Sequence, residues 1–254
     1  MQPGRLTART LKDRAGRLMR TGGIIAAGWG ERLGQKIPKA LTPVGGRKLI
    51  DYTLDGLEAA GLSQITCIVN EAATEVPAYV RASRPHLQME WIIRTTPSSM
   101  HSFLIVLERL AKNGPGPFFM TTVDSVCSPE TYRRFAEAGR SFQKADVLLG
   151  LTDVIEDEKP LRVTLRDEEQ PGIYQIAEIG GASDSAYVTS GFYWVQPTIL
   201  KEKNPALEQG YSALRQYLGH LLKYGYRFYG IPLPPVIDVD RPEDIRSAER
   251  FLTR

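Results

Sequence analysis

The chain has 254 residues, of which 42% are hydrophobic and 24% are charged, and its formal net charge is +3. This length and balance predict one large α/β domain with a full hydrophobic core. The first 20 residues carry +5 of that charge and the remaining chain carries −2, which argues against a nucleic-acid-binding protein. The two cysteines, Cys67 and Cys127, argue against a disulfide framework and are too few for a four-ligand zinc site.

The sequence shows no pattern of a membrane or secreted protein. No apolar run reaches the roughly 20 residues that a membrane-spanning helix needs. Residues 1–20 lack the apolar core of a signal peptide, so we expect a cytoplasmic protein with no membrane partner. These residues are expected to be a basic extension that is disordered or non-native, with Met19 as the natural start. Residues 21–254 are expected to form a single domain.

Strand-like and helix-like patterns alternate from residue 22 to residue 151. Between residues 48 and 60, for example, Leu49, Tyr52 and Leu57 recur on one side of a helix that Gly61 closes. This alternation predicts a parallel sheet with helices on both faces. Strands are expected at residues 22–27, 65–69, 89–93, 118–123 and 145–151, and helices at residues 48–60, 72–83, 98–111 and 129–139.

The rhythm changes beyond residue 151. Three strand patterns follow one another without intervening helices, which predicts an antiparallel or mixed extension of the sheet. The predicted fold class is therefore α/β, with three α/β/α layers around a mainly parallel, mixed central sheet. The later elements are expected as strands at residues 163–166, 173–178, 188–195, 227–230 and 236–239, and helices at residues 211–224 and 242–252.

A glycine-containing loop follows the first predicted strand. The segment Gly23–Leu41, GIIAAGWGERLGQKIPKAL, begins with small apolar residues and continues into a long basic loop. Gly28 and Gly30 expose backbone amides, and Arg32 and Lys39 add two cations. Amides and cations on one loop suit a polyphosphate ligand.

Two commoner glycine motifs do not fit this loop. The dinucleotide fingerprint G-x-G-x-x-G would need a glycine where Leu33 stands, with a helix beginning inside the turn. The P-loop would need Ser or Thr after Lys36, where Ile37 stands. The plainer alternative is a strand-to-helix connection in which the glycines are incidental.

Three aspartates stand where strands are predicted to end. Asp124 follows an apolar strand, which suits a Mg²⁺ ligand, and a cap of the following segment is the alternative. Asp238 and Asp240 lie two apart on a strand, so both point to one face. Asp240 with Glu243 also fits a capping box. The local pattern therefore favours Asp240 as the cap and Asp238 as the metal ligand.

The loop resembles the signature of the nucleotidyltransferases that make nucleotide-sugars, a superfamily that includes the NDP-sugar pyrophosphorylases and the MobA-like proteins. The resemblance covers about residues 22–253. It implies that Ala27, Gly28, Gly30 and the Arg32 side chain hold the triphosphate, and that Lys39 stabilises charge on the reacting phosphate. The matching positions are Ala26, Ala27, Gly28, Gly30, Arg32, Leu33, Pro38, Lys39 and Leu41.

The same resemblance implies a Mg²⁺ site. The family carries a metal-binding aspartate after the strand that ends here at Asp124. Its C-terminal motif V-D-x-P-E-D-[LI] matches residues 239–245 and places the second metal-binding aspartate at Asp240. Asp240 is therefore the first candidate from the resemblance, and Asp238 is the second.

The resemblance also implies where the nucleotide base and the acceptor bind. The base is expected near Thr95, Ser98 and Ser99, but the family's glycine-rich L-G-T-A version is absent, and a plain helix cap at Ser98 is the alternative. Trp29 stands where the family has a small residue, and it would either stack on the base or cover the loop. The acceptor is expected at Glu178, Ser190 and Gly191, although Ile179 replaces the lysine that often follows the glutamate.

These features together predict Mg²⁺-dependent transfer of a nucleotidyl group from a nucleoside triphosphate to a phosphorylated small-molecule acceptor, with release of pyrophosphate. A sugar 1-phosphate is the preferred acceptor, and Arg32 and Lys39 are the predicted catalytic residues. One alternative is a non-sugar acceptor of the phosphocholine or molybdopterin type. The other is a catalytically weak relative that binds nucleotide. The pattern assigns neither the base nor the oligomeric state.

Overall fold

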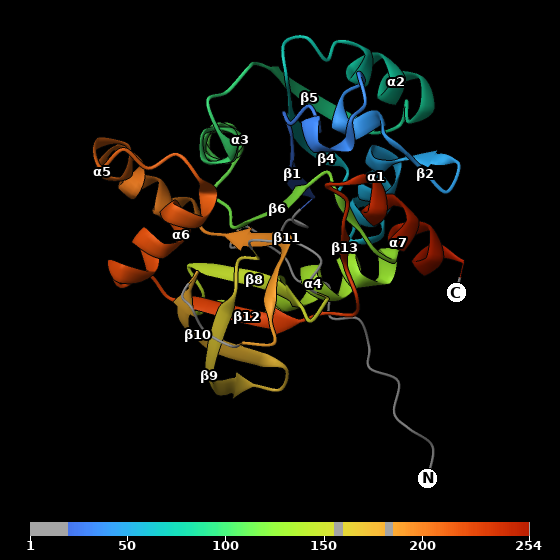
Figure 1. Ribbon diagram of the computed structural model, residues 1–254. Coiled ribbons are helices and arrows are strands. Elements are labelled where there is room, and N and C mark those ends of the chain that lie inside the picture. The colour runs from blue at the N-terminus through green and yellow to red at the C-terminus, as the bar shows by residue number, and fades with distance from the viewer. Residues whose placement is uncertain (1–19, 155–159, 181–184, 254) are drawn as a thin grey trace.

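The computed structural model describes residues 20–154, 160–180 and 185–253 (Figure 1). The predicted N-terminal extension lies outside these residues, apart from Arg20. A nine-stranded sheet runs through the molecule in the order β5-β4-β1-β6-β11-β8-β12-β10-β9. Its strands are β1 (Thr21–Ala26), β4 (Gln64–Val69), β5 (Gln88–Ile93), β6 (Phe118–Thr122), β8 (Val147–Thr152), β9 (Val163–Gln170), β10 (Ile173–Ile179), β11 (Val188–Val195) and β12 (Phe228–Pro232).

The sheet changes character at β11. Strands β5, β4, β1 and β6 run parallel to one another, whereas β11 is antiparallel to both of its neighbours, β6 and β8. β12 is parallel to β8, and β10 is antiparallel to β12 and to β9. The predicted α/β fold class is confirmed, and so is the mixed extension of the sheet after residue 151.

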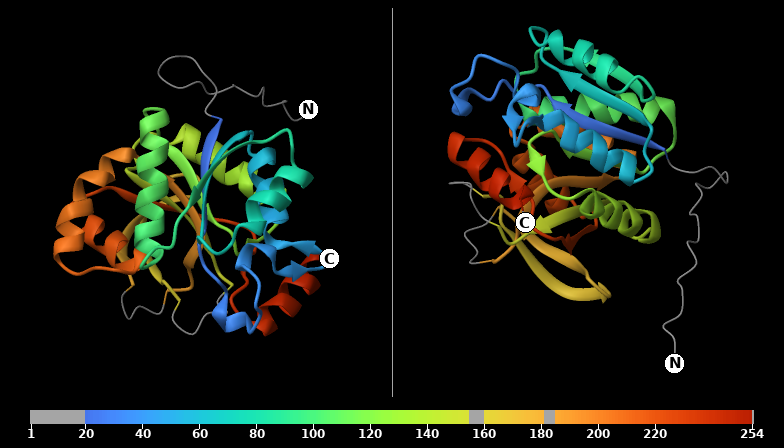
Figure 2. Two further views of the ribbon diagram at one scale, coloured as in Figure 1. Left: turned by 90° about the horizontal axis from the view of Figure 1, so that it is seen from above. Right: turned by 90° about the vertical axis from the view of Figure 1, so that its right-hand side faces the viewer.

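Helices cover both faces of this sheet (Figure 2). One face packs against α1 and α4, and the other packs against α3 and α6. None of the helices in the described part of the chain has the length and apolar character needed to cross a lipid bilayer. The helices are α1 (Leu49–Ala59), α2 (Glu75–Ser83), α3 (Ser99–Asn113), α4 (Pro129–Ser141), α5 (Lys203–Glu208), α6 (Leu214–Lys223) and α7 (Pro242–Leu252).

Small residues allow close packing on both faces. A Cβ on Gly23 of β1 would lie 2.6 Å from the Val106 side chain of α3. A Cβ on Gly56 of α1 would lie 2.2 Å from the Tyr132 ring of α4. Contacts this short are not available to a larger side chain, so these glycines let helix and strand, or helix and helix, approach closely.

The long elements lie near their predicted positions, and α7 has the predicted bounds. The predicted helices at residues 72–83 and 211–224 begin later, at Glu75 and Leu214. Several short elements were not predicted, because they are too short to show a hydrophobic period and depend on tertiary pairing. They are the 3₁₀ helices η1 (Glu31–Leu33), η2 (Lys39–Leu41) and η3 (Pro197–Glu202), the helix α5, the pair of β2 (Pro43–Val44) with β3 (Arg47–Lys48), and β7 (Ser125–Val126). The strand predicted at residues 236–239 is present as the shorter β13 (Ile237–Asp238), which pairs with β7.

Candidate active site

A cavity of about 710 Å³ opens beyond the carboxyl ends of β1 and β6. This is where ligands bind in open α/β sheets. The chain leaves β1 at Ala26, and residues 27–32 line the cavity. The chain leaves β6 at Thr122, and residues 122–124 line the cavity beside them. Two neighbouring strands therefore deliver the glycine loop and Asp124 to one place.

The glycine loop turns back on itself at Gly30. This residue has a φ of 68° and a ψ of 41°, the left-handed conformation that glycine adopts without strain. A Cβ at Gly30 would also lie 2.9 Å from the Leu33 side chain and 3.3 Å from the Lys39 Cβ. The turn thus lies against the first side-chain carbons of Lys39, and Lys39 begins η2 with its side chain buried.

Three aspartates converge beside Lys39. The side chains of Asp124, Asp238 and Asp240 each offer an oxygen, and these oxygens lie within 4.8 Å of one another. We call these residues the aspartate triad. They meet because β13 pairs with β7, which places Asp238 opposite Ser125, and because the Val239 N–H donates to the Asp124 carbonyl at 3.1 Å.

The prediction that Asp240 caps the last helix is wrong. The carboxylate of Asp244 accepts hydrogen bonds from the backbone N–H groups of Asp240, at 2.9 Å, and of Arg241, at 2.7 Å. Asp244 is buried and satisfies the amides at the start of α7 from within the helix. The Asp240 side chain instead faces Lys39 and Arg32.

Lys39 and Arg32 pair with the triad. The Lys39 Nζ donates to Asp124 Oδ2 at 2.5 Å and also contacts Asp240 Oδ1. The Arg32 Nη2 lies 2.7 Å from Asp240 Oδ2. The predicted catalytic cations and metal ligands therefore lie together, although they come from distant parts of the sequence.

Lys39 and Asp124 each stabilise the charged form of the other, and this shifts the pKa values of both. Burial alone would lower the pKa of Lys39, but the carboxylates of Asp124, Asp238 and Asp240 outweigh burial and hold its pKa above the ordinary value. Burial alone would raise the pKa of Asp124, but Lys39 holds it below the ordinary value. Lys39 is therefore a cation and Asp124 an anion at neutral pH.

The triad fits a hard divalent cation. Carboxylate oxygens are the ligands that Mg²⁺ prefers, and it takes one or two of them together with phosphate oxygens and water. The triad offers oxygens from three carboxylates at the wall of an open cavity. A metal bound there would have coordination positions left for a nucleotide.

The start of α3 forms a second, hydroxyl-rich wall. Thr96, Ser98, Ser99 and Ser102 all line the cavity. Ser98 caps α3 as predicted, because its Oγ accepts from the His101 N–H. Two of the expected base-binding residues therefore lie at the cavity, together with Trp29.

Thr95 lies apart from this wall. Its hydroxyl lies 3.3 Å from Asn70 Oδ1 and 3.5 Å from Glu71 Oε2. Thr95 does not line the cavity, in contrast to its neighbour Thr96. Of the three residues expected near the base, Thr95 is the one that lies outside the cavity lining.

Of the three residues expected to bind the acceptor, one lines the cavity and two do not. Ser190 on β11 lines the cavity, and its buried hydroxyl has no hydrogen-bond partner among the described residues. Gly191 does not line the cavity, but its φ of 79° and its packing against Thr122 and Ser125 shape the strand there. Glu178 is exposed on β10 and also lies outside the lining.

Several residues that line the cavity were not predicted as site residues, and Arg215 and Tyr193 are two of them. Arg215 lies in the first turn of α6 and lines the cavity on another wall from the triad. Tyr193 of β11 also lines it, and its ring packs edge-to-face on Phe103 at 5.6 Å. An arginine at the start of a predicted helix was the only available signal for Arg215, and such arginines are common.

No cysteine or histidine among the described residues lines the cavity. Cys67 and Cys127 are buried, and burial raises the pKa of both thiols, so neither is a reactive thiolate. Each histidine contacts a polar side chain: His86 contacts Glu58, His101 contacts Ser98 and His220 contacts Glu202.

Comparison with known proteins places the chain in a family. The MobA-like NTP transferase domain matches residues 22–171, and the chain belongs to that family. The predicted membership of the nucleotidyltransferase superfamily is thereby confirmed.

Two curated relatives illustrate the range of the similarity. CMP-5'-(3-aminopropyl)phosphonate synthase of Streptomyces rubellomurinus is 26% identical over 196 residues, which are 73% of this chain and 30% of that protein. The bifunctional IPC transferase and DIPP synthase of Thermococcus kodakarensis is 28% identical over 241 residues, which are 91% of this chain and 50% of that protein. The chain thus spans half or less of the length of these relatives.

Solved structures share the fold over nearly the whole chain. The inositol-1-phosphate CTP transferase from T. maritima has a TM-score of 0.76 at 17% identity and covers 93% of this chain and 97% of its own. A UDP-glucose pyrophosphorylase complexed with UDP-glucose has a TM-score of 0.75 at 17% identity, over 92% of this chain and 99% of its own. At this identity the likeness establishes the fold alone.

Proposed function

We propose that this chain catalyses Mg²⁺-dependent transfer of a nucleotidyl group from a nucleoside triphosphate to a phosphorylated acceptor. The observation that carries the proposal is the convergence of Arg32, Lys39 and the aspartate triad at the end of the glycine loop, in one open cavity. Loop amides and cations suit the triphosphate, and the triad suits its metal. Family membership supports the same reaction class.

The proposed reaction needs alignment more than acid–base chemistry. An oxygen of the acceptor's phosphate attacks the α-phosphorus of the nucleotide, a new P–O bond forms, and the bond to the bridging oxygen breaks so that pyrophosphate leaves. The attacking phosphate is already an anion, so no general base is required. Arg32 and Lys39 would hold the phosphates and offset charge that develops on them.

Asp124 and Asp240 are the proposed metal ligands, with Asp238 as a further ligand. A bound Mg²⁺ would supply additional charge neutralisation at the phosphates. The amides of residues 27–30 would hold the phosphates from the other side, as exposed backbone N–H groups do in other phosphate loops.

CTP is the nucleotide that we propose to test first. The inositol-1-phosphate CTP transferase and the CMP-phosphonate synthase, by their names, handle cytidine nucleotides. Other relatives act on other bases, among them a mannose-1-phosphate guanyltransferase. The hydroxyls of Ser98 and Ser99 can donate or accept hydrogen bonds, so they suit a base edge of either polarity.

A sugar 1-phosphate remains the first acceptor, and a phosphonate or a phosphocholine-type acceptor is the second candidate. The position of Glu178 favours the second candidate, because this residue lies outside the cavity and has no lysine after it. The cation at the acceptor end would then be Arg215, which lines the cavity on α6.

The test is pyrophosphate release with Mg²⁺ across CTP, UTP, GTP, ATP and dTTP. Each nucleotide is combined with glucose 1-phosphate, inositol 1-phosphate, 2-aminoethylphosphonate and phosphocholine. We expect release with one pair, abolished by EDTA and by Asp124→Asn, because the triad then loses a charged ligand. Release that persists unchanged in Asp124→Asn would contradict the metal site. Silence across the panel with nucleotide binding intact would favour a weakly catalytic relative or a molybdopterin-type acceptor.

A further inference from the structure

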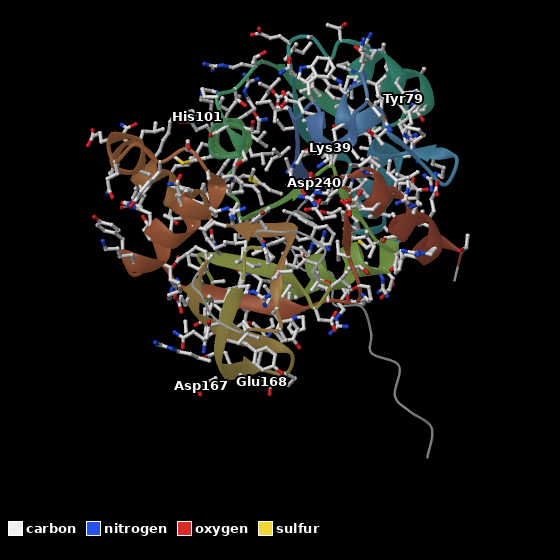
Figure 3. All side chains as sticks on the ribbon, in the orientation of Figure 1. Lys39, Tyr79, His101, Asp167, Glu168 and Asp240 are labelled. Atoms are coloured by element: carbon white, nitrogen blue, oxygen red, sulfur yellow. The ribbon has the colours of Figure 1, made fainter. Side chains whose placement is uncertain are left out.

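The Lys39 side chain reaches the same oxygens that a metal would use. Its Nζ contacts both Asp124 and Asp240, which contribute two of the three carboxylates of the triad. Figure 3 labels Lys39 and Asp240 next to one another. One ammonium group therefore bridges two proposed metal ligands.

Packing holds Lys39 in this position. The side chain is buried, and the turn at Gly30 packs against its Cβ and Cγ. The two residues after it in η2, Ala40 and Leu41, are also buried, so the backbone beneath the side chain is fixed. Lys39 also lines the open cavity, so a movement of the far end of its side chain would bring the ammonium group into that cavity.

The second cation completes the arrangement. The two oxygens of Asp240 are divided between Lys39, which contacts Oδ1, and Arg32, which contacts Oδ2. The three carboxylates of the triad carry three negative charges, and the side chains of Lys39 and Arg32 supply two positive charges beside them. Most of the charge that would attract a free divalent cation is thus already neutralised from within the chain.

We propose that Lys39 is an internal competitor of the metal, so that a divalent cation binds the triad tightly only together with a nucleotide. The nucleotide's phosphates would offer Lys39 a new anionic partner and draw its Nζ off the aspartates. This inference rests on the proposed metal site, and it assigns to Lys39 a role in the order of binding besides its role at the reacting phosphate.

The energetic consequence is a coupling between the two ligands. A site that is competent in only a fraction of molecules binds with an affinity reduced by that fraction. Nucleotide that removes Lys39 from the triad raises this fraction, and by linkage the metal must tighten nucleotide binding by the same factor. Part of the coupling should therefore disappear when Lys39 is absent.

The experiment measures Mn²⁺ binding to the full chain by electron paramagnetic resonance of the free ion, with no acceptor present. The variants are Lys39→Met and, as a matched control, Lys36→Met, which removes an exposed lysine of the same loop. Without nucleotide we expect Lys39→Met to bind Mn²⁺ at least about tenfold tighter than the wild type does. A tenfold difference would mean that Lys39 leaves the triad open in about one wild-type molecule in ten. Lys36→Met should bind as the wild type does.

A second measurement needs only the wild type. A non-hydrolysable CTP analogue, or the analogue of whichever nucleotide binds, should tighten Mn²⁺ in the wild type by a larger factor than in Lys39→Met. Adding Asp240→Asn to Lys39→Met should abolish the gain, which would locate it at the triad. Wild-type binding of Mn²⁺ without nucleotide as tight as that of Lys39→Met would overturn the inference.

The outcomes separate this inference from the proposed reaction. Suppose that Lys39→Met binds Mn²⁺ more tightly but the wild type releases no pyrophosphate with any substrate pair. That result would support the role of Lys39 and count against the proposed substrates. Absence of Mn²⁺ binding in all variants, even with nucleotide, would overturn the metal site and the inference together. Pyrophosphate release with unchanged Mn²⁺ affinity in Lys39→Met would overturn the inference alone.

Discussion

At the scale of single residues, the candidate site depends on a few charged side chains in unusual surroundings. Lys39 is a buried lysine that three carboxylates keep protonated. Isolated buried charges are costly, and one that is paired and faces a cavity is a candidate functional group. Arg215 belongs to the same cavity but comes from a different wall, so the two cations have separable proposed roles.

Replacing Lys39 should mainly reduce turnover. We expect Lys39→Ala to lower kcat by about 10²–10³-fold, the usual effect of losing one group that stabilises transition-state charge. The KM of the nucleotide should change much less. Steady-state kinetics with the active substrate pair would measure both values, with Lys36→Ala as the control. Wild-type turnover in Lys39→Ala would show that the lysine has no role in the reaction.

Replacing Arg215 should mainly weaken acceptor binding. We expect Arg215→Ala to raise the acceptor KM roughly tenfold or more, because a hydrogen bond to a charged group is worth about 1.5–3 kcal/mol. The nucleotide KM should stay near the wild-type value. Lys223→Ala removes a cation from the last turn of the same helix and serves as the control. Equal acceptor KM values in both variants would rule Arg215 out as the acceptor's cation.

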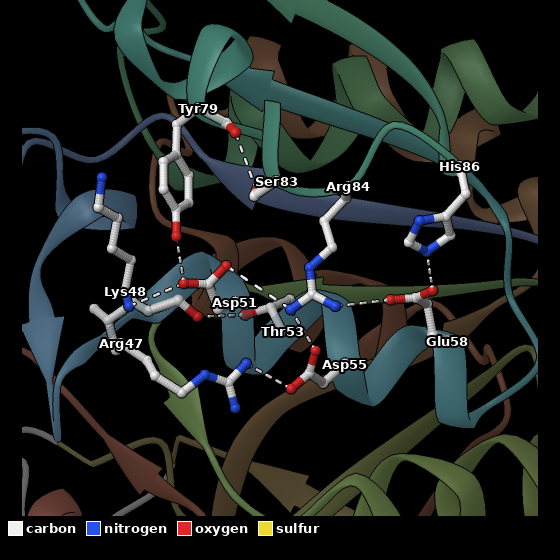
Figure 4. Close-up of polar contacts among 11 residues, drawn as sticks. Arg47, Lys48, Asp51, Thr53, Asp55, Glu58, Tyr79, Ser83, Arg84 and His86 are labelled. Atoms are coloured by element: carbon white, nitrogen blue, oxygen red, sulfur yellow. Dashed lines mark hydrogen bonds and ion pairs between the residues drawn. The ribbon is translucent and has the colours of Figure 1, made fainter. Parts of the chain in front are cut away.

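At the scale of elements, a polar network joins α1 to α2 and to the β2–β3 hairpin (Figure 4). Asp51 of α1 is buried and accepts from the Tyr79 hydroxyl of α2 at 2.7 Å and from the Lys48 N–H at 3.1 Å. Arg84, just after α2, contacts Asp55 of α1 at 2.6 Å. The network holds α1 in place, and α1 packs on one face of the nine-stranded sheet.

Loss of Asp51 should therefore destabilise the fold more than loss of Asp55. Asp51→Ala leaves a backbone N–H and a tyrosine hydroxyl without their acceptor, which costs about 1–3 kcal/mol. Asp55→Ala removes more exposed ion pairs, to Arg47 and Arg84, and should cost about 1 kcal/mol or less. Urea unfolding curves would compare the two variants. Equal midpoints would show that the buried position of Asp51 carries no extra stability.

Asp244 provides a second test at the scale of elements. It holds the backbone at Asp240 and Arg241, where β13 gives way to α7. Asp244→Ala should cost about 1 kcal/mol of stability, as loss of a helix cap does, and should also weaken Mn²⁺ binding because Asp240 loses its support. Mn²⁺ affinity unchanged in a destabilised Asp244→Ala would restrict this residue to capping.

At the scale of the whole molecule, the candidate site draws on segments from both ends of the chain. The glycine loop lies near the start of the described residues, and Asp240 lies near their end. The glycine loop follows β1 of the nine-stranded sheet, and Asp240 follows β13, which pairs with β7 in a separate two-stranded sheet. We infer that residues 21–254 act as one cooperative unit.

Unfolding should therefore be a single transition. Trp29 and Trp91 lie in the first half of the chain and Trp194 in the second, so fluorescence reports on both. We expect fluorescence and far-UV circular dichroism to give the same midpoint. Mg²⁺ with the preferred nucleotide should raise that midpoint, because a ligand that binds the native state stabilises it. Separate midpoints would indicate two folding units.

Much of the fold could be predicted from the sequence alone, because hydrophobic periodicity is local. The alternation of strands and helices, the change after residue 151 and the glycine loop with Arg32 and Lys39 all follow from neighbouring residues. The cap at Ser98 was likewise predictable, since capping involves residues three apart.

The tertiary structure alone decided which side chains meet. Nothing local indicates that Asp240 meets Lys39, or that Arg215 lines the cavity while Glu178 does not. These outcomes depend on the pairing of β13 with β7 and on the order of strands in the sheet, which join residues more than a hundred positions apart. Local sequence specifies the elements, whereas long-range packing and backbone pairing determine which charges share one cavity.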